Sequence, residues 1–128
     1  MADLRQGRIV WVELLDPQGR NPKVRPAVVL TSTAEIAATG TIRVAAGTSD
    51  VGSVPADEGV TLPWLATGHP TTKLTRPSVA VVTWIADVPA SAVRVAGTVP
   101  LKPFLELTAK VASRNAPPPV APSPPPPP

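Results

Sequence analysis

RIVWVELL (residues 8–15) and RPAVVLTS (residues 25–32) are the two stretches that decide the fold. Both are rich in β-branched and apolar residues, which favours buried strands. The nine residues between them include two prolines, a glycine and an asparagine, and this composition predicts a turn. From residue 17 to residue 25 the only charged side chains are those of Arg20, Lys23 and Arg25. The pattern therefore predicts a β-hairpin with a basic turn.

The rest of the sequence predicts a mainly β domain with one helix near its end. Further strands are expected at residues 41–46, 59–64, 78–85 and 93–99, with residues 78–85 as the most apolar and most central strand. Residues 33–40 are interpreted as a connection, because Thr39-Gly40 would end a helical turn quickly. Residues on one side of a helix extending to about residue 114 should pack across the barrel. These are Leu101, Phe104, Leu105 and Val111.

The length of 128 residues supports a single domain with one modest core. We expect residues 1–114 to form this domain. Residues 115–128 are expected to form a disordered or polyproline II tail, because residues 116–128 contain nine of the 19 prolines. No apolar run is long enough to span a bilayer, so the protein is expected to be soluble, cytoplasmic and not bound to a membrane.

The composition argues against several classes of site. The chain has no cysteine, one histidine and scattered carboxylates, so neither a disulfide scaffold nor a metal site is predicted. It has no P-loop and no dinucleotide-binding fingerprint, and no cofactor is expected. A net charge of +3 does not by itself indicate nucleic-acid binding. With few aromatic rings for base stacking, any RNA would be held mainly by backbone and hydrogen-bond contacts.

Several segments resemble the MazF/PemK family of toxin endoribonucleases. The resemblance rests on Gly7 with the strand from Ile9 to Leu14, on Asp16-Pro17, and on residues 25–30; it continues in residues 42–49 and 75–82. It covers roughly residues 5–113. The resemblance implies a small SH3-like antiparallel β-barrel with a C-terminal helix, of the MazF/PemK/CcdB-like kind and usually homodimeric. It also implies metal-independent cleavage of single-stranded RNA at short motifs, leaving 2′,3′-cyclic phosphate and 5′-hydroxyl ends, and silencing by an antitoxin protein.

Metal-free RNA cleavage needs an attacking 2′-hydroxyl in line with the phosphate, a cation on the phosphoryl oxygens and groups that move protons. Arg25 is the candidate cation, because its planar guanidinium matches a phosphate and the family's catalytic arginine stands at this position. Thr48 and Ser49 match the family's catalytic threonine and the serine beside it. A hydroxyl there can donate to a phosphoryl oxygen. The structural alternatives are an ordinary surface arginine and a hydroxyl pair that only shapes a turn.

Other basic residues are candidates for contacts with RNA phosphates. Together with Arg25 they would form a groove whose affinity for RNA falls with salt, although each alone could simply be a solvated surface charge. These residues are Arg20, Lys23, Lys73 and Arg76. His69 is a possible proton carrier, because it lies in a polar loop; the alternative is an ordinary surface histidine.

The sequence departs from the family at its carboxylates. Many members carry a glutamate in the first loop, where this chain has Arg20 and Asn21, and another branch carries an arginine and an aspartate where this chain has Val81 and Thr83. Three functions therefore stay open. The first is an endoribonuclease toxin, and the second is a catalytically weakened relative that binds RNA or an antitoxin. The third is a non-nuclease module whose proline tail recruits a partner with an aromatic groove.

Overall fold

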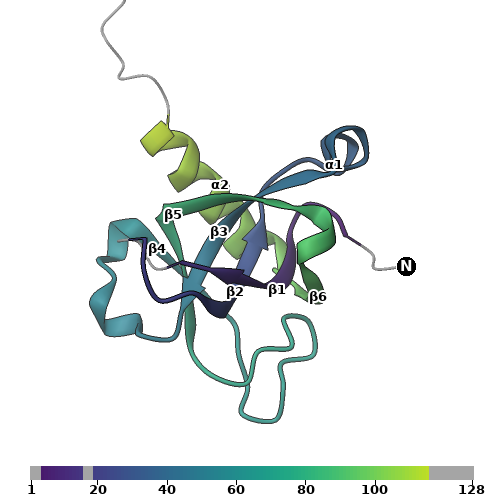
Figure 1. Cartoon of the computed structure of the whole chain (residues 1–128). Helices are drawn as coiled ribbons and strands as arrows, with labels where there is room; N and C mark the ends of the chain where they lie inside the picture. Colours follow the sequence, from purple (N-terminus) through teal and green to yellow (C-terminus); the bar gives the residue numbers. More distant parts are fainter. Residues whose placement is uncertain (1–3, 16–18, 116–128) are drawn as a thin grey trace, which may run out of the picture.

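A computed structural model describes residues 4–15 and 19–115. Six antiparallel strands form one strongly curled sheet in the order β4-β5-β3-β2-β1-β6 (Figure 1). The strands are β1 (Arg8–Leu14), β2 (Lys23–Val29), β3 (Thr41–Thr48), β4 (Gly59–Leu62), β5 (Ser78–Pro89) and β6 (Arg94–Thr98). The two α-helices are α1 (Thr33–Thr39) and α2 (Leu101–Asn115), and three short 3-10 helices are η1 (Val51–Ser53), η2 (Ala56–Glu58) and η3 (Ala90–Ala92). The predicted mainly β, SH3-like fold with a C-terminal helix is confirmed, and its barrel takes the form of a curled six-stranded sheet, a half-barrel.

The predicted hairpin is confirmed, with β1 and β2 paired from Ile9↔Val28 to Leu14↔Lys23. The prediction that residues 78–85 form the most central strand is wrong. β5 lies second from one edge of the sheet, and β3 and β2 hold the central positions. The apolar character of β5 reflects burial of its first half, Ser78 to Val82, rather than a central place in the sheet. The proline-rich segment 116–128 lies outside the described residues.

Residues 33–39 form the helix α1, and the interpretation of this segment as a mere connection is wrong. Ser32 caps its start, because the hydroxyl oxygen of Ser32 accepts a hydrogen bond from the backbone N–H of Glu35 at 3.3 Å. Gly40 ends it in the left-handed conformation, with φ 71°, and its N–H donates to the carbonyl of Ile36 at 2.9 Å. Ile36 is buried, so two caps and one apolar anchor suffice for a short helix.

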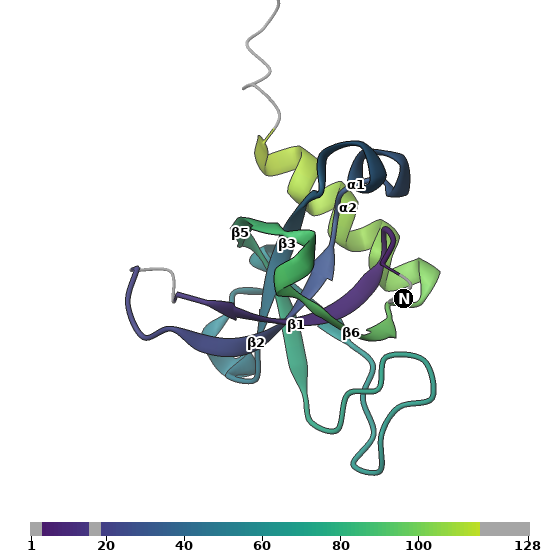
Figure 2. The ribbon, with the colours of Figure 1, turned by 45° about the vertical axis from the view of Figure 1, so that its right-hand side comes forward.

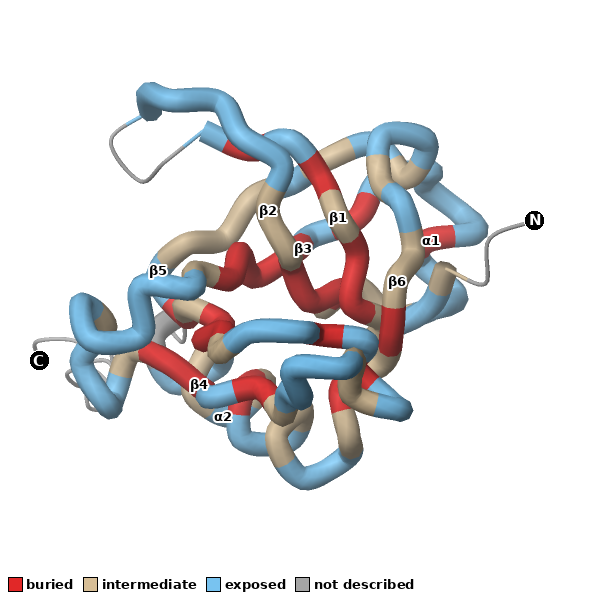
Figure 3. The backbone as a smooth tube through the Cα atoms, turned by 90° about the horizontal axis from the view of Figure 1, so that it is seen from below, coloured by how far each residue is buried: buried red, intermediate tan, exposed pale blue. Residues whose placement is uncertain are grey.

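The curled sheet separates two clusters of buried side chains. Figure 3 shows the buried stretches of the strands in red. Consecutive residues of a strand point to opposite faces, so Ile9 enters the first cluster and Val10 the second. The first cluster is covered by α2, which crosses behind the sheet, and contains Leu107 (Figure 2). The second cluster lies on the side of α1 and contains Ile36. Both clusters draw on β1, β2 and β3, which makes these three strands the structural centre of the domain.

The buried face of α2 differs from the predicted one. Leu107 is completely buried, and Phe104 and Val111 pack partly buried against the first cluster. Leu101 and Leu105 are 72% and 56% exposed, so their predicted place on the packed face is wrong. Residues 104, 107 and 111 follow the helical spacing i, i+3 and i+7, and Leu107 occupies the middle of that stripe.

The long loop between β4 and β5 is anchored on β6, as Figures 1 and 2 both show. The backbone N–H of Thr98 donates to the carbonyl of Thr71 at 2.9 Å. Thr72 is fully buried, and its hydroxyl donates to the carbonyl of Pro63 at 2.7 Å. A Cβ atom added at Gly97 would overlap the backbone of Thr72, so glycine is what allows the loop to approach β6.

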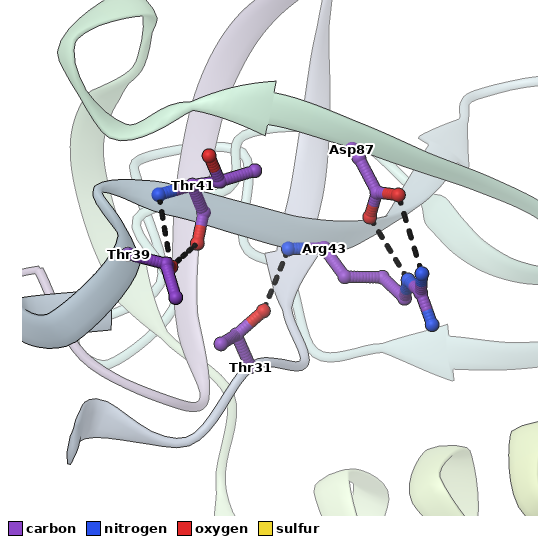
Figure 4. Close-up of polar contacts among 5 residues, drawn as sticks. All are labelled: Thr31, Thr39, Thr41, Arg43 and Asp87. Atoms are coloured by element: carbon purple, nitrogen blue, oxygen red, sulfur yellow. Dashed lines mark hydrogen bonds and ion pairs between the residues drawn. The ribbon is translucent and has the colours of Figure 1, made fainter. Parts of the chain in front are cut away.

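An exposed ion pair joins β3 to β5 at the end of the sheet near α1 (Figure 4). Arg43 donates from Nε and Nη2 to the two carboxylate oxygens of Asp87, at 2.9 and 3.2 Å. These hydrogen bonds lower the pKa of Asp87 below its ordinary value of 3.8. Slight desolvation raises this pKa and so opposes the shift, whereas the positive charge of Arg43 lowers it further. The hydroxyl of Thr31 accepts the backbone N–H of Arg43 and ties this strand end to the residues before α1.

Replacing Leu107 by alanine should lower the free energy of unfolding by about 2–5 kcal/mol, because it leaves a cavity beneath the sheet. Leu105→Ala is the matched control, since Leu105 is exposed on the same helix; its cost should stay within about 0.5 kcal/mol. Urea denaturation of both variants measures the difference. Equal costs would contradict the assignment of the buried face.

The ion pair between Arg43 and Asp87 should make the free energy of unfolding depend on pH, with less stability in acid. Because the folded pKa of Asp87 is lowered, its stabilisation is present above the ordinary pKa of 3.8 and disappears as pH falls through the lower folded value. Urea midpoints of wild type and Asp87→Asn should therefore differ by a small constant amount near neutral pH and converge below pH 3.8. In an Arg43→Gln background, Asp87→Asn should have no such pH-dependent effect; a persistent one would assign it to another group.

Candidate functional site

A cavity of about 460 Å³ opens where the end of β3 meets the start of β2 and the residues that precede β5. Both polar or charged residues and apolar residues line it. The polar and charged residues are Lys23, Arg25, Thr48, Ser49, Asp50, Thr75, Arg76 and Ser78. The apolar residues, with one glycine, are Trp11, Val24, Pro26, Gly47 and Leu74. The three predicted catalytic residues, Arg25, Thr48 and Ser49, therefore line the same cavity. Two of the predicted phosphate-binding residues, Lys23 and Arg76, line it as well.

Strand pairing explains why Arg25 and Thr48 border the same cavity. β2 and β3 are antiparallel, and their last paired residues at this end are Ala27 and Ala46. Two residues further, on the same face of each strand, stand Arg25 and Thr48. Gly47 allows the strands to stay close here, since a Cβ atom at this position would lie 3.2 Å from the carbonyl oxygen of Pro26.

Arg25 is half-buried and held on several sides. Its guanidinium carbon lies 4.9 Å from the centroid of the Trp84 ring, a cation–π distance. Nε donates to the carbonyl of Leu14 and Nη2 to the carbonyl of Asn21, each at 3.4 Å. Within residues 4–15 and 19–115, these bonds use two of the five N–H donors of the guanidinium, and the other three can face an oxyanion.

Thr48 is half-buried at the end of β3, and Ser49 follows it on the surface. The hydroxyl oxygen of Thr48 accepts the backbone N–H of Asp50 at 3.1 Å. Because the oxygen is the acceptor in this bond, the hydroxyl proton is left to be donated elsewhere. The turn-shaping contact that the sequence suggested as an alternative is therefore present, and it is compatible with a donor role for the same hydroxyl.

The predicted phosphate contacts divide into two groups. Lys23 and Arg76 are exposed and line the cavity, so the structure brings them together with Arg25. Arg20 is exposed in the hairpin turn, and it does not line the cavity. Lys73 is exposed in the long loop before β5, and it too is outside the cavity lining.

His69 also stands outside the cavity lining. Its Nδ1 atom accepts the backbone N–H groups of Thr71 at 3.1 Å and Thr72 at 3.2 Å. A nitrogen that accepts these bonds carries no proton, which places the ring proton of the neutral side chain on Nε2. The visible role of His69 is thus to hold the loop that rests on β6.

Asp50 is the residue that sequence reasoning missed. It lies two positions after Thr48, it is exposed and it lines the cavity, so a carboxylate is present although the family's usual acidic positions are not occupied. The available signal was its place in the loop that follows the Thr48-Ser49 pair. Val81 and Thr83, which stand where one branch of the family has charged residues, lie on β5 and do not line the cavity.

No group of three or more acidic or histidine side chains that could hold a metal ion occurs within residues 4–15 and 19–115. Among the same residues, no helix is long and apolar enough to cross a membrane.

Solved structures share this fold. The chain superimposes on MazF from Deinococcus radiodurans with a TM-score of 0.67 at 22% identity, covering 89% of this chain and 97% of that one. A MazE–MazF complex from the same organism gives a TM-score of 0.67 at 23% identity, covering 88% and 96%. The Mycobacterium tuberculosis toxin MazF-mt6 gives 0.61 at 20% identity, covering 83% and 94%. At these identities the likeness is one of fold.

The family comparison extends over most of the chain. A search of curated proteins found no match. The family model described as the PemK-like, MazF-like toxin of type II toxin-antitoxin systems matches residues 5–113. That range contains all six strands and nearly all of α2, and it includes the cavity at the ends of β2 and β3. The chain therefore belongs to the PemK-like, MazF-like toxin family of type II toxin-antitoxin systems.

Proposed function

We propose that this protein is a metal-independent endoribonuclease that cuts single-stranded RNA and leaves 2′,3′-cyclic phosphate and 5′-hydroxyl ends. The observation that carries the proposal is the shared cavity, which joins a guanidinium, a threonine hydroxyl with an available proton and two further cations. Membership of a toxin family whose members are generally endoribonucleases supports the same activity.

In the proposed reaction, the 2′-oxygen of one nucleotide attacks the adjacent phosphorus. A bond between O2′ and phosphorus forms and the bond between phosphorus and O5′ breaks. The 2′-hydroxyl proton passes to a base, and the leaving O5′ takes a proton from water. Arg25 stabilises the negative charge that builds on the phosphoryl oxygens, and Thr48 donates a hydrogen bond to one of them. Ser49 offers a second hydroxyl beside it, and Lys23 and Arg76 hold the neighbouring phosphates.

Asp50 supplies the proton acceptor in this proposal. Its backbone is hydrogen-bonded to Thr48, so its carboxylate belongs to the same loop as the hydroxyl that contacts the phosphate. A carboxylate in this position takes the 2′-hydroxyl proton without requiring an arginine to act as a base, for which a guanidinium is poorly suited. His69 becomes unnecessary for this step.

We also propose that the protein forms a homodimer, as the family resemblance implies, and that it binds an antitoxin. Solved structures similar to this chain include an endoribonuclease in complex with its cognate antitoxin from a mycobacterial species, with a TM-score of 0.61 at 14% identity, covering 88% of this chain and 93% of that one. We propose that an antitoxin segment silences the protein by occupying the cavity in place of RNA. The second candidate function, a weakened relative that binds RNA or an antitoxin without cutting, is motivated by the absence of the family's usual carboxylates.

Arg25→Ala and Thr48→Ala should each lower cleavage of a long single-stranded RNA in EDTA by about 10²–10³-fold, because each removes a group that contacts transition-state charge. New 2′,3′-cyclic phosphate ends, mapped on the cut RNA, measure the reaction. Arg94→Ala is the control, since Arg94 is an exposed arginine that does not line the cavity. Binding of RNA by folded wild type without any cut would favour the weakened relative instead.

Asp50→Asn should lower the cleavage rate by about 10²-fold or more, because an amide does not accept the proton of the 2′-hydroxyl. RNA affinity, measured separately by fluorescence anisotropy, should not weaken, since the substitution removes a negative charge beside the phosphates. Asp57→Asn is the matched control, because Asp57 is exposed and does not line the cavity. An unchanged rate in Asp50→Asn would remove Asp50 from the mechanism and leave the roles of Arg25 and Thr48 intact.

A further inference from the structure

We propose that Trp84 is a positioning residue that holds the guanidinium of Arg25 in its productive orientation. This inference rests on the proposed cleavage activity and deepens it. The ring of Trp84 lies under the guanidinium, with 4.9 Å between its centroid and the Cζ atom of Arg25. Trp84 is half-buried and packs against the second core cluster, so the ring is fixed by the core and provides a stable surface for the cation.

An irregularity in β5 brings the Trp84 ring next to the start of β2. The pairing of β3 with β5 jumps from Ala45↔Ile85 to Gly47↔Ala80, so residues 81–84 lie where the two strands lose their regular register. Such an irregularity re-aims side chains within a sheet. Arg25 lies on β2, on the same face of the strand as Ala27, which belongs to the second core cluster.

The contacts that Arg25 makes with the described residues orient its guanidinium without neutralising its charge. Among the described residues, its recorded partners are an aromatic ring and two backbone carbonyls, and none of them carries a negative charge. A carboxylate partner would compete with phosphate for the guanidinium, whereas an indole face attracts the cation and leaves its N–H edge available. The ring therefore takes the orienting role that an acidic neighbour could play, at no cost in positive charge.

A positioning role predicts a specific pattern in the kinetics. Trp84→Leu should lower kcat for RNA cleavage by about 3–30-fold with little change in KM, because it loosens a group that acts in the transition state. Trp84→Phe keeps an aromatic face and should restore most of the rate. Trp64→Leu is the matched control, since Trp64 is 40% exposed and does not line the cavity; its rate should equal that of wild type.

A double-mutant cycle separates positioning from damage to the fold. In an Arg25→Ala background, Trp84→Leu should produce no further loss of residual cleavage, since there is no guanidinium left to position. An equal loss in both backgrounds would overturn the inference and assign Trp84 a purely structural role. Failure of Trp84→Phe to recover the rate beyond that of Trp84→Leu, while it remains folded, would overturn it as well.

A second measurement does not depend on cleavage. In the NMR spectrum of the free protein, the ring current of the aromatic side chain at position 84 should shift the Nε–H resonance of Arg25 upfield in wild type and in Trp84→Phe, but not in Trp84→Leu. The Trp64→Leu spectrum should retain the shift. If wild type shows this pattern but cuts no RNA, the proposed function fails and the contact stands; if wild type cuts RNA but the shift is absent, the positioning inference alone fails.

Discussion

The antiparallel pairing of β2 with β3 is the interaction on which the rest of the structure depends. The pairs Val28↔Ala45 and Ala27↔Ala46 send consecutive side chains into opposite core clusters, so one ladder helps to build both layers of the core. Two residues beyond the pair Ala27↔Ala46, Arg25 near the start of β2 and Thr48 at the end of β3 border the cavity. The hydrogen bonds that stabilise the sheet therefore also set the separation between a guanidinium and a hydroxyl, and this separation is maintained by the core.

The electrostatic character of the cavity follows from how its charges are distributed. Arg25, Lys23 and Arg76 reach it from β2 and from the segment before β5, while Asp50 comes from the loop after β3. Cation and carboxylate therefore stand on different elements, and the recorded contacts of Arg25 with described residues are uncharged. Such an arrangement keeps positive charge available for phosphoryl oxygens and still provides a proton acceptor, which is the division of roles that the proposed reaction requires.

The success of sequence interpretation varied with how local each pattern was. The β1–β2 hairpin was predictable because β-branched runs and turn residues act within a few positions of one another. The helix α1 was missed because its stability comes from the caps at Ser32 and Gly40 and from burial of Ile36, which short periodicity does not reveal. α2 contains several apolar residues, and its contact with the sheet buries Leu107 while Leu101 and Leu105 stay exposed. Apolarity alone does not say which face is buried.

The sequence by itself determined the fold class, the family resemblance and the candidacy of Arg25, Thr48 and Ser49, because these depend on local composition and on motifs contiguous along the chain. Only the tertiary structure decided which candidates share a space. It brought Asp50 to the cavity, placed Trp84 under Arg25 and left His69 and Lys73 outside the lining. The physical reason is that distances between residues 25, 50 and 84 depend on strand order and on the register shift in β5, which arise from packing of the whole sheet.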